Sequence, residues 1–190
     1  QIDDVHAEFS WGSSTWKAHT WEKVSVVQSV HALGFNVVHT DIDVVWLRDP
    51  LKYFIEKYTL PDYMVSLDPI TTANALGDDG PEKGTNVAHY MNTGVYFLRA
   101  TPGGSALINK WVELRSSPYG TTYHDQDGLY QYLTHDDLTS KVDLEKRVVQ
   151  VVELQTKLGQ LAANQFQNAY SHCINKVHEV HGLKPYAVHF

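Results

Sequence analysis

Two carboxylates separated by a single residue, Asp41 and Asp43, follow the β-rich run 35–40. Where a strand passes into a loop, two such side chains can converge on one cation. Hard oxygen ligands suit Mg2+ or Mn2+, which complete their coordination shells with substrate phosphates and water. An isolated Asp-x-Asp more often belongs to a solvated turn, but the flanking residues Val44, Val45 and Trp46 are too apolar for an ordinary exposed turn. We therefore expect a divalent metal here, of the kind that binds a diphosphate.

The charge of the chain favours a bound cation as the partner of any phosphorylated substrate. The formal net charge is -7, so a phosphate would be repelled unless a local positive charge offset this. A bound metal supplies that charge and, as a Lewis acid, stabilises the charge on a departing nucleotide. The same balance argues against a nucleic-acid partner, because surfaces that bind nucleic acids need clustered Lys and Arg.

His189 is a candidate third metal ligand near the end of the sequence. It follows a short apolar run that predicts a last strand over residues 186–189. A neutral imidazole is a competent ligand for Mn2+. The chain has 11 histidines, so an ordinary hydrogen-bonded histidine is an equally good interpretation of this residue alone.

Three further groups of residues are candidates for substrate contacts. Asp125 and Gln126 lie at the expected start of a helix, where a carboxylate either caps the helix or orients a hydroxyl and stabilises an oxocarbenium-like sugar. Asn92 can exchange hydrogen bonds with sugar hydroxyls and Gly94 permits close backbone approach, although a plain turn explains this spacing equally well. Lys23, on the first expected helix, either faces solvent or neutralises phosphate.

Length and composition indicate a single domain. The 190 residues and the 43% hydrophobic content fit one globular unit with one buried core. Cys173 is the only cysteine, so no disulfide can form within the chain. No stretch reaches the roughly 20 apolar residues that span a bilayer, and residues 1–10 lack the pattern of a signal peptide. We expect one domain over residues 1–190, as a fragment of a longer chain whose targeting or membrane segment lies outside it.

Helical and strand patterns alternate along the chain. Apolar residues at helical spacing, followed by Gly34, predict a helix over residues 14–33. The other expected elements are helices over 51–58, 104–116 and 125–133 and strands over 35–40, 63–67, 94–98, 147–154 and 186–189. Residues 69–89 predict a long loop. The alternation predicts an α/β fold with a mainly parallel sheet, and Asp41 and Asp43 then lie at a strand's carboxyl end, where such sheets bind ligands.

The order of the motifs along the chain resembles a known enzyme family. The motifs are Glu22-Lys23, the block Asp-x-Asp-x-x-Trp-x-x-x-Pro from Asp41 to Pro50, Asn92-Thr93-Gly94 with Arg99, and Asp125-Gln126. Together they resemble the plant and algal nucleotide-diphospho-sugar transferase family, which includes extensin arabinosyltransferases and pectin xylosyltransferases. The resemblance runs from about Trp16 to Phe190, nearly the whole chain.

The resemblance implies a fold and an activity. The expected fold is GT-A, a Rossmann-like mixed, mainly parallel sheet flanked by helices. The expected activity is metal-dependent transfer of arabinose, xylose or galactose from a UDP-sugar donor, with Mn2+ as the usual metal and Mg2+ as the alternative. The implied acceptors are cell-wall polysaccharides or hydroxyproline-rich glycoproteins, and the implied location is the Golgi lumen or the secretory pathway.

The resemblance also assigns roles to individual residues. The metal ligands are Asp41, Asp43 and, in the family's closing block at residues 184–189, His189. The positions around the donor are Asp68 after the next strand, Asn92 and Gly94 in a turn of the donor pocket, and Asp125 and Gln126 near the sugar.

One departure from the family pattern keeps two rivals open. Nothing before Trp16 matches the strand and helix that usually hold the uridine, so we expect an incomplete N-terminal part of the fold. The first rival is a catalytically silent relative that acts as a structural or glycan-binding subunit. The second is a metal-dependent hydrolase or phosphatase that uses the same carboxylates.

Overall fold

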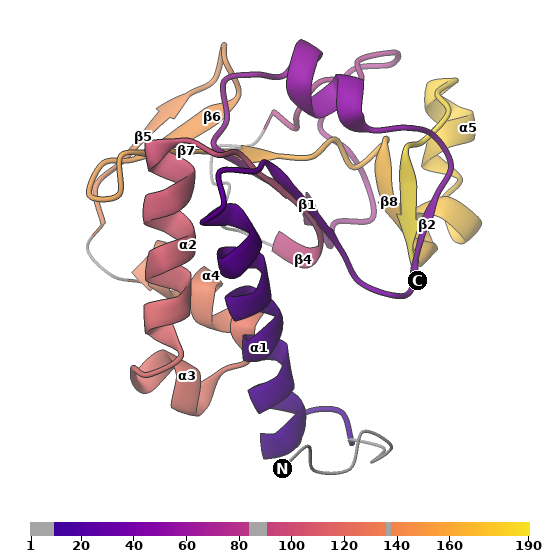
Figure 1. Cartoon of the computed structure of the whole chain (residues 1–190). Helices are drawn as coiled ribbons and strands as arrows, with labels where there is room; N and C mark the ends of the chain where they lie inside the picture. The colour runs from indigo at the N-terminus through magenta and orange to yellow at the C-terminus, as the bar shows by residue number, and fades with distance from the viewer. Residues whose placement is uncertain (1–9, 84–90, 136–137) are drawn as a thin grey trace.

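The structure, a computed structural model, describes residues 10–83, 91–135 and 138–190. A six-stranded sheet carries helices on one face, and a small three-stranded sheet lies beside it (Figure 1). The strands are β1 (Val37–Thr40), β2 (Val44–Trp46), β3 (Tyr63–Leu67), β4 (Met91–Leu98), β5 (Ser140–Asp143), β6 (Val148–Val151), β7 (Thr156–Gln160), β8 (Phe166–Asn168) and β9 (Ala187–His189). The helices are α1 (Ser14–His31), α2 (Pro102–Leu114), α3 (Pro118–Thr122), α4 (Asp125–His135) and α5 (Val177–His181), with π-helical turns η1 (Tyr53–Lys57) and η2 (Tyr170–Ile174).

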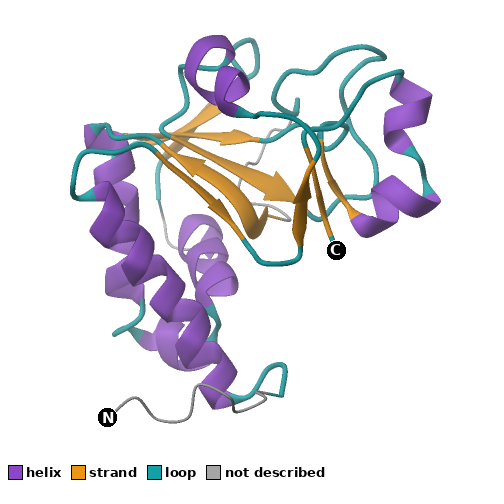
Figure 2. Ribbon diagram, turned by 45° about the vertical axis from the view of Figure 1, so that its right-hand side comes forward, coloured by secondary structure: helices purple, strands orange, loops and turns teal. Residues whose placement is uncertain are grey.

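The main sheet is mixed, with the strand order β1-β4-β3-β7-β6-β5, and the small sheet has the order β2-β9-β8. Figure 2 shows the strands in orange and the longer helices beside the main sheet. Among the described strands, β3 pairs with β7 and β8 with β9 in parallel, and the other five pairings are antiparallel. The expected α/β fold with flanking helices is confirmed, whereas the expectation of mainly parallel strands is corrected. The reason is that β5, β6 and β7 follow one another through tight turns, which join antiparallel neighbours without a crossover helix.

Helix α1 begins and ends where local chemistry dictates. The Ser13 side chain accepts a hydrogen bond from the backbone N–H of Trp16 and so caps the first turn. The buried residues Trp21, Val24 and Val27 of this helix recur at intervals of three and belong to the larger hydrophobic core. The chain leaves the helix through Gly34, whose φ of 87° suits a residue without a Cβ.

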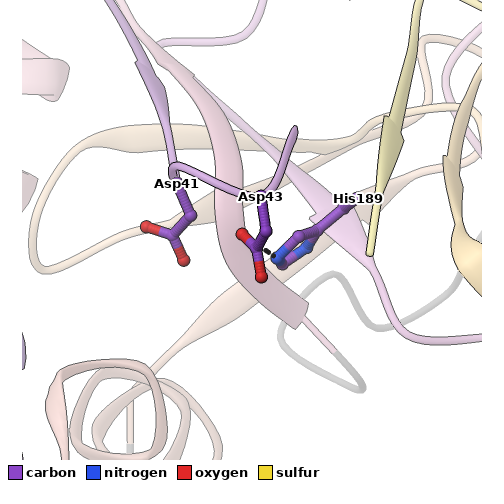
Figure 3. A group of neighbouring side chains, drawn as sticks. All are labelled: Asp41, Asp43 and His189. Atoms are coloured by element: carbon purple, nitrogen blue, oxygen red, sulfur yellow. Dashed lines mark ion pairs between the residues drawn. The ribbon is translucent and has the colours of Figure 1, made fainter. Parts of the chain in front are cut away.

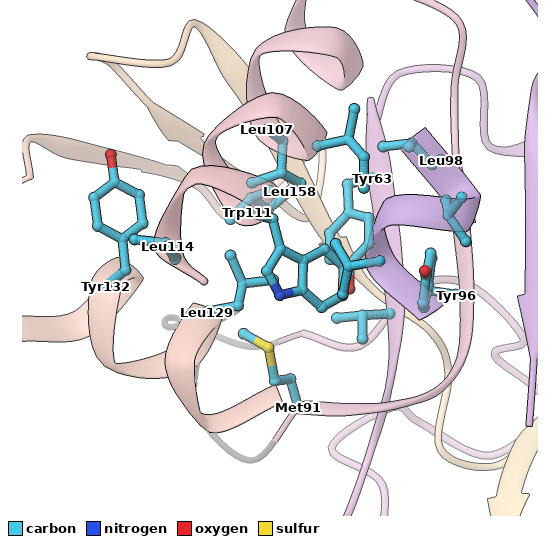
Figure 4. Close-up of a cluster of buried hydrophobic side chains, with 14 of the residues drawn as sticks. Tyr63, Met91, Tyr96, Leu98, Leu107, Trp111, Leu114, Leu129, Tyr132 and Leu158 are labelled. Atoms are coloured by element: carbon cyan, nitrogen blue, oxygen red, sulfur yellow. The ribbon is translucent and has the colours of Figure 1, made fainter. Parts of the chain in front are cut away.

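The larger core lies between the sheet and helices α1, α2 and α4, and it is centred on Trp111 of α2 (Figure 4). The Trp111 ring is fully buried and lies 5.5 Å from the ring of Tyr96 and 6.1 Å from that of Tyr63, measured between centroids. Fully burying one large apolar side chain stabilises a fold by about 1.5–3 kcal/mol. The indole N–H donates to the carbonyl of Asp125 at 2.9 Å, so this core also fixes the start of α4.

A second core covers the opposite face of the main sheet. There η1 supplies Tyr53 and Phe54, both fully buried, and Phe54 stacks on Phe97 of β4 at a centroid distance of 4.7 Å. Phe166 of β8 packs against both residues of η1. These contacts join the small sheet to the main one, which decides where the strand carrying His189 lies.

The sequence patterns located most of these elements but missed others. Strand β4 begins at Met91, so Asn92 and Thr93 belong to the strand and not to a preceding turn. The expected strand over 147–154 ends at Val151, and a turn leads into β7, which the patterns missed along with β5 and β8. The described part of the expected loop, residues 69–83, is irregular, and residues 84–89 lie outside the described residues. None of the described helices has the length and apolar character that crossing a bilayer requires.

Candidate functional site

Two strand pairings bring the acidic pair and His189 together. Strand β1 pairs with β4, and the backbone N–H of Asp41 continues this ladder by donating to the carbonyl of Gly94 at 2.8 Å. Strand β2 pairs with β9 so that Val44 lies opposite His189. The backbone N–H of Phe190 donates to the carbonyl of Asp43 at 3.0 Å. The site therefore lies where the main sheet and the small sheet meet.

The three side chains form a cluster with the composition of a divalent-metal site. One ligand atom from each of Asp41, Asp43 and His189 lies within 4.8 Å of the other two. His189 Nε2 is 3.3 Å from Asp43 Oδ1, and both carboxylates project to the same side of the turn that joins β1 to β2 (Figure 3). The two carboxylates suit Mn2+ or Mg2+, and the imidazole favours Mn2+ of the two. Asp43 is 51% exposed, which leaves space for substrate phosphates beside a metal held here.

Gly94 makes room for His189. A Cβ built on Gly94 would lie 2.1 Å from Cε1 and 2.6 Å from Nδ1 of the His189 ring, far inside van der Waals contact. The ring therefore packs directly on the β4 backbone. We expected Gly94 to let the backbone approach a donor, which stays a prediction, and the structure shows that the missing Cβ also admits the candidate third ligand.

Asp41 is surrounded by positive and donor groups. Burial raises the pKa of its carboxyl, but the hydrogen bond from His39 and the charge of Lys23 more than offset burial, so the pKa lies below the ordinary value of 3.8. His39 Nε2 is 3.1 Å from Asp41 Oδ1, and its ring stacks on Tyr96 at 4.6 Å. Asp41 is therefore ionised at neutral pH, as a metal ligand must be.

Lys23 connects the acidic pair to the start of α4. Its Nζ is 3.6 Å from Asp41 Oδ1 and 3.2 Å from Asp125 Oδ2, and it donates to Thr93 Oγ1 at 3.4 Å. The Asp125 side chain is only 2% exposed, and burying a carboxylate without a partner is costly. Lys23 therefore does not face solvent, as one of the two expectations had it. Its ammonium group balances two carboxylates.

The remaining expected residues line the same region with different exposures. Gln126 Oε1 accepts from the backbone N–H of Thr93 at 2.8 Å. Asn92 Oδ1 accepts from the backbone N–H of Gly94, and its Nδ2 donates to Asp68 Oδ1 at 2.7 Å. Asp68 is exposed and reaches the cluster through Asn92. The network holds the β4 backbone beside His189.

A pocket of about 670 Å³ contains most of these groups, within the range of ordinary ligand sites. It is lined by Lys23, Asp41, Asn92, Thr93, Asp125, Gln126 and His189, and also by Trp11, Trp16, His19, Thr20, Ile42 and His124. Asp43 and Asp68 are not part of this lining. The expected residues that the structure gathers around this cavity are therefore Lys23, Asp41, Asn92, Asp125, Gln126 and His189, and Gly94 is not part of the lining either.

Sequence reasoning missed three contributors to this site. Period-two alternation along β1 places His39 on the same side as Asp41, and that spacing could have revealed it. Thr93 lies between two expected residues, but only the fold shows that it bonds both Lys23 and Gln126. Trp11, Trp16 and His124, whose aromatic rings line the same pocket, have no distinctive spacing relative to the acidic pair.

Comparison with known protein families supplies the assignment. The model of the nucleotide-diphospho-sugar transferases matches residues 1–190, the whole chain. The chain belongs to this family. The resemblance drawn from the motifs is thereby confirmed.

Three of the relatives found among curated proteins carry the names of glycosyltransferases for different sugars. Arabinosyltransferase XEG113 of Arabidopsis thaliana is 25% identical over 182 residues, which are 96% of this chain and 27% of that protein. UDP-D-xylose:L-fucose alpha-1,3-D-xylosyltransferase 3 of the same plant is 29% identical over 130 residues, 65% of this chain and 33% of that protein. UDP-galactose:fucoside alpha-3-galactosyltransferase of Dictyostelium discoideum is 31% identical over 91 residues, 48% of this chain and 12% of that protein.

Each match covers a larger share of this chain than of the relative. The chain spans about a third or less of the length of each of the three. A search of solved structures gave no significant match.

Proposed function

We propose that this chain is the metal-binding part of a glycosyltransferase that moves a sugar from a UDP-sugar donor to a glycan or glycoprotein acceptor. The observation that carries the proposal is the convergence of Asp41, Asp43 and His189 within 4.8 Å, beside a pocket that also holds Asp125 and Gln126. The names of the relatives support sugar donors. Arabinose, xylose and galactose are the donor sugars that we propose to test.

The residues divide the work along the pocket. Asp41, Asp43 and His189 would hold Mn2+ or Mg2+, which when bound offsets the charge of the diphosphate. Lys23, whose Nζ lies 3.6 Å from Asp41 and 3.2 Å from Asp125, offsets part of the negative charge of these two carboxylates and so reduces their repulsion of a phosphate.

The sugar end of the pocket is formed by the start of α4 and by β4. Asp125 and Gln126 would contact the transferred sugar, and Asn92 offers an amide to its hydroxyls. The backbone of Asp125 is held by the indole of Trp111 at 2.9 Å, and its carboxylate is held by Lys23. These groups are therefore oriented before substrate binds, which is what a site that distinguishes sugars by hydrogen bonding requires.

The proposed setting follows from the resemblance of the motifs to the family. We propose cell-wall polysaccharides or hydroxyproline-rich glycoproteins as acceptors, and the Golgi lumen or the secretory pathway as the location. Membrane attachment would come from a segment outside this chain. The rival of a catalytically silent, glycan-binding subunit uses the same pocket without turnover, and the hydrolase rival would release free sugar without an acceptor.

The decisive experiment measures UDP release from UDP-arabinose, UDP-xylose and UDP-galactose with pectic and hydroxyproline-rich acceptors, with and without Mn2+. We expect release with at least one donor to need the metal and to be lost in Asp43→Ala. Asp143→Ala, an acidic residue on the distant edge strand β5, is the matched control. Full turnover in metal-free buffer refutes the proposal. Calorimetry of UDP with Mn2+ separates the silent relative, which binds without turnover, from a scaffold that gives no metal-dependent heat.

A further inference from the structure

The pocket continues past the sugar end into a wall of aromatic rings to which no role has been given. The Trp16 ring lies 5.1 Å from the His124 ring and 5.4 Å from the Trp11 ring, measured between centroids. All three residues line the cavity that holds Asp41, Asp125 and His189. Trp11 is 83% exposed, so this wall presents apolar rings to solvent.

The aromatic wall is displaced from the metal cluster along the axis of α1. Lys23, Thr20 and Trp16 are spaced by three and four residues and so lie on one face of the helix. At 1.5 Å per residue, Trp16 is about 10 Å from Lys23 along the helix. Lys23 contacts Asp41 and Asp125 at the other end of this face. The order along the pocket is therefore metal ligands, then Lys23 with Asp125, then the aromatic wall.

This order indicates which substrate part the wall would meet. On the proposed function, the diphosphate lies at the metal and the transferred sugar lies at Asp125 and Gln126. The nucleoside extends from the diphosphate in the other direction from the sugar. A group on the far side of Asp125 from the metal is consequently the acceptor, because the acceptor must approach the sugar at its free face.

The chemistry of the wall fits a sugar ring. The faces of indole rings are apolar and carry negative charge density, with which the weakly positive C–H groups on the face of a sugar ring pack favourably. His124 adds a polar edge to the wall. Its ring is held in place because Nδ1 accepts a hydrogen bond from the backbone N–H of Asp127 at 3.2 Å. Nearby Thr20 provides a hydroxyl on the same side of α1.

We propose that Trp16 and Trp11, with His124, form the acceptor subsite, in which the ring of an acceptor sugar stacks on indole next to the donor sugar. The assignment of this wall to the acceptor rests on the proposed function, whereas the binding of a sugar to the rings does not depend on it. The expected ligand is a neutral sugar ring, either at the end of a glycan or inside it. The same surface would bind a simple methyl glycoside weakly.

The test titrates methyl fucoside, methyl galactoside and methyl arabinoside into the chain, with and without UDP and Mn2+, and detects binding by saturation-transfer NMR. We expect at least one glycoside to bind, with saturation strongest at its ring C–H protons. Trp16→Ala should weaken that binding about tenfold, and Trp11→Ala should weaken it severalfold. Tyr170→Ala is the control: it removes a ring that is 51% exposed and outside the pocket, and it should leave glycoside binding unchanged.

The outcomes separate this inference from the proposed function. Equal glycoside binding by the wild-type chain, Trp16→Ala and Trp11→Ala overturns the acceptor subsite, and so does the absence of glycoside binding. Weaker binding of UDP in Trp16→Ala with unchanged glycoside binding also overturns it, because the wall would then hold the nucleoside. If the wild-type chain shows no metal-dependent binding of UDP, this counts against the proposed function, whether or not glycosides bind. Because Trp16 is half-buried, unfolding curves establish that the variant is folded, and the exposed Trp11 provides the second variant.

Discussion

Gly94→Ala is the sharpest test of the proposed metal site, because it changes a residue that would not itself contact the metal. The added methyl group would lie 2.1 Å from Cε1, 2.6 Å from Nδ1 and 2.8 Å from Nε2 of His189. Carbon atoms pack at about 3.5 Å, so the imidazole would have to retreat by more than about 1 Å. Gly94 has an ordinary φ, so the backbone accepts alanine without strain and the effect falls on the ring.

A retreat of that size separates His189 from the two aspartates. Displacing one ligand or its support typically costs about 10–100-fold in metal affinity. We expect the dissociation constant for Mn2+, measured by calorimetry in the presence of UDP, to rise by that factor in Gly94→Ala. Gly159→Ala on β7 is the matched control, because its added methyl would meet Pro61 at 3.0 Å, far from the aspartates.

A double-mutant cycle decides whether the effect passes through the imidazole. If Gly94→Ala acts only by moving His189, it should add nothing to the loss already caused by His189→Ala. Unchanged Mn2+ affinity in Gly94→Ala would mean that His189 is not a ligand. A further loss in the double variant would show that the methyl group disturbs the site by another route.

Three further predictions concern the charges around the pocket and in the loop before β4. Asp43→Asn should lower Mn2+ affinity at least tenfold and change the free energy of unfolding by less than about 0.5 kcal/mol, because the side chain is half exposed; calorimetry and urea unfolding measure the two. Lys23→Met should reduce the free energy of unfolding by about 1–3 kcal/mol, because it leaves the Asp125 carboxylate buried without its cation, and adding Asp125→Asn should restore part of the loss in the same urea titration. The hydrogen bond from Arg147 lowers the pKa of Asp78 from 3.8 to about 2; this depressed pKa stabilises the fold above about pH 4 and the benefit disappears as pH falls toward 2, so acid unfolding curves of the wild type and Asp78→Asn should converge over that window.

The sequence predicted the acidic pair and its partner because their chemistry is local or distinctive. Asp41 and Asp43 are close in sequence and follow a β-rich run, so their joint position at a strand end could be inferred. His189 was one histidine of 11, and the family resemblance selected it. The structure supplies the reason that the pattern lacked, which is the pairing of β9 with β2.

Other features depended on contacts between distant segments. The salt bridge between Lys23 and Asp125 joins two helices far apart in sequence, and no periodicity reports such a pair. Strand β7 was missed because Thr156–Gln160 contains Lys157 and Gly159, which favour no strand, yet it is held between β3 and β6 in the middle of the sheet. Tertiary pairing overrode local propensity there.

The junction of the two sheets has a consequence for how this region assembles. The aspartates belong to the beginning of the chain and the imidazole to its last strand, which has only three residues. A cation bound between them would cross-link two segments and close a loop that spans most of the polypeptide. Part of the free energy of metal binding would then stabilise the docked position of β9. Occupancy by the ion and order at the carboxyl-terminal end would then rise and fall together, so chelation should loosen this end before it unfolds the rest of the protein.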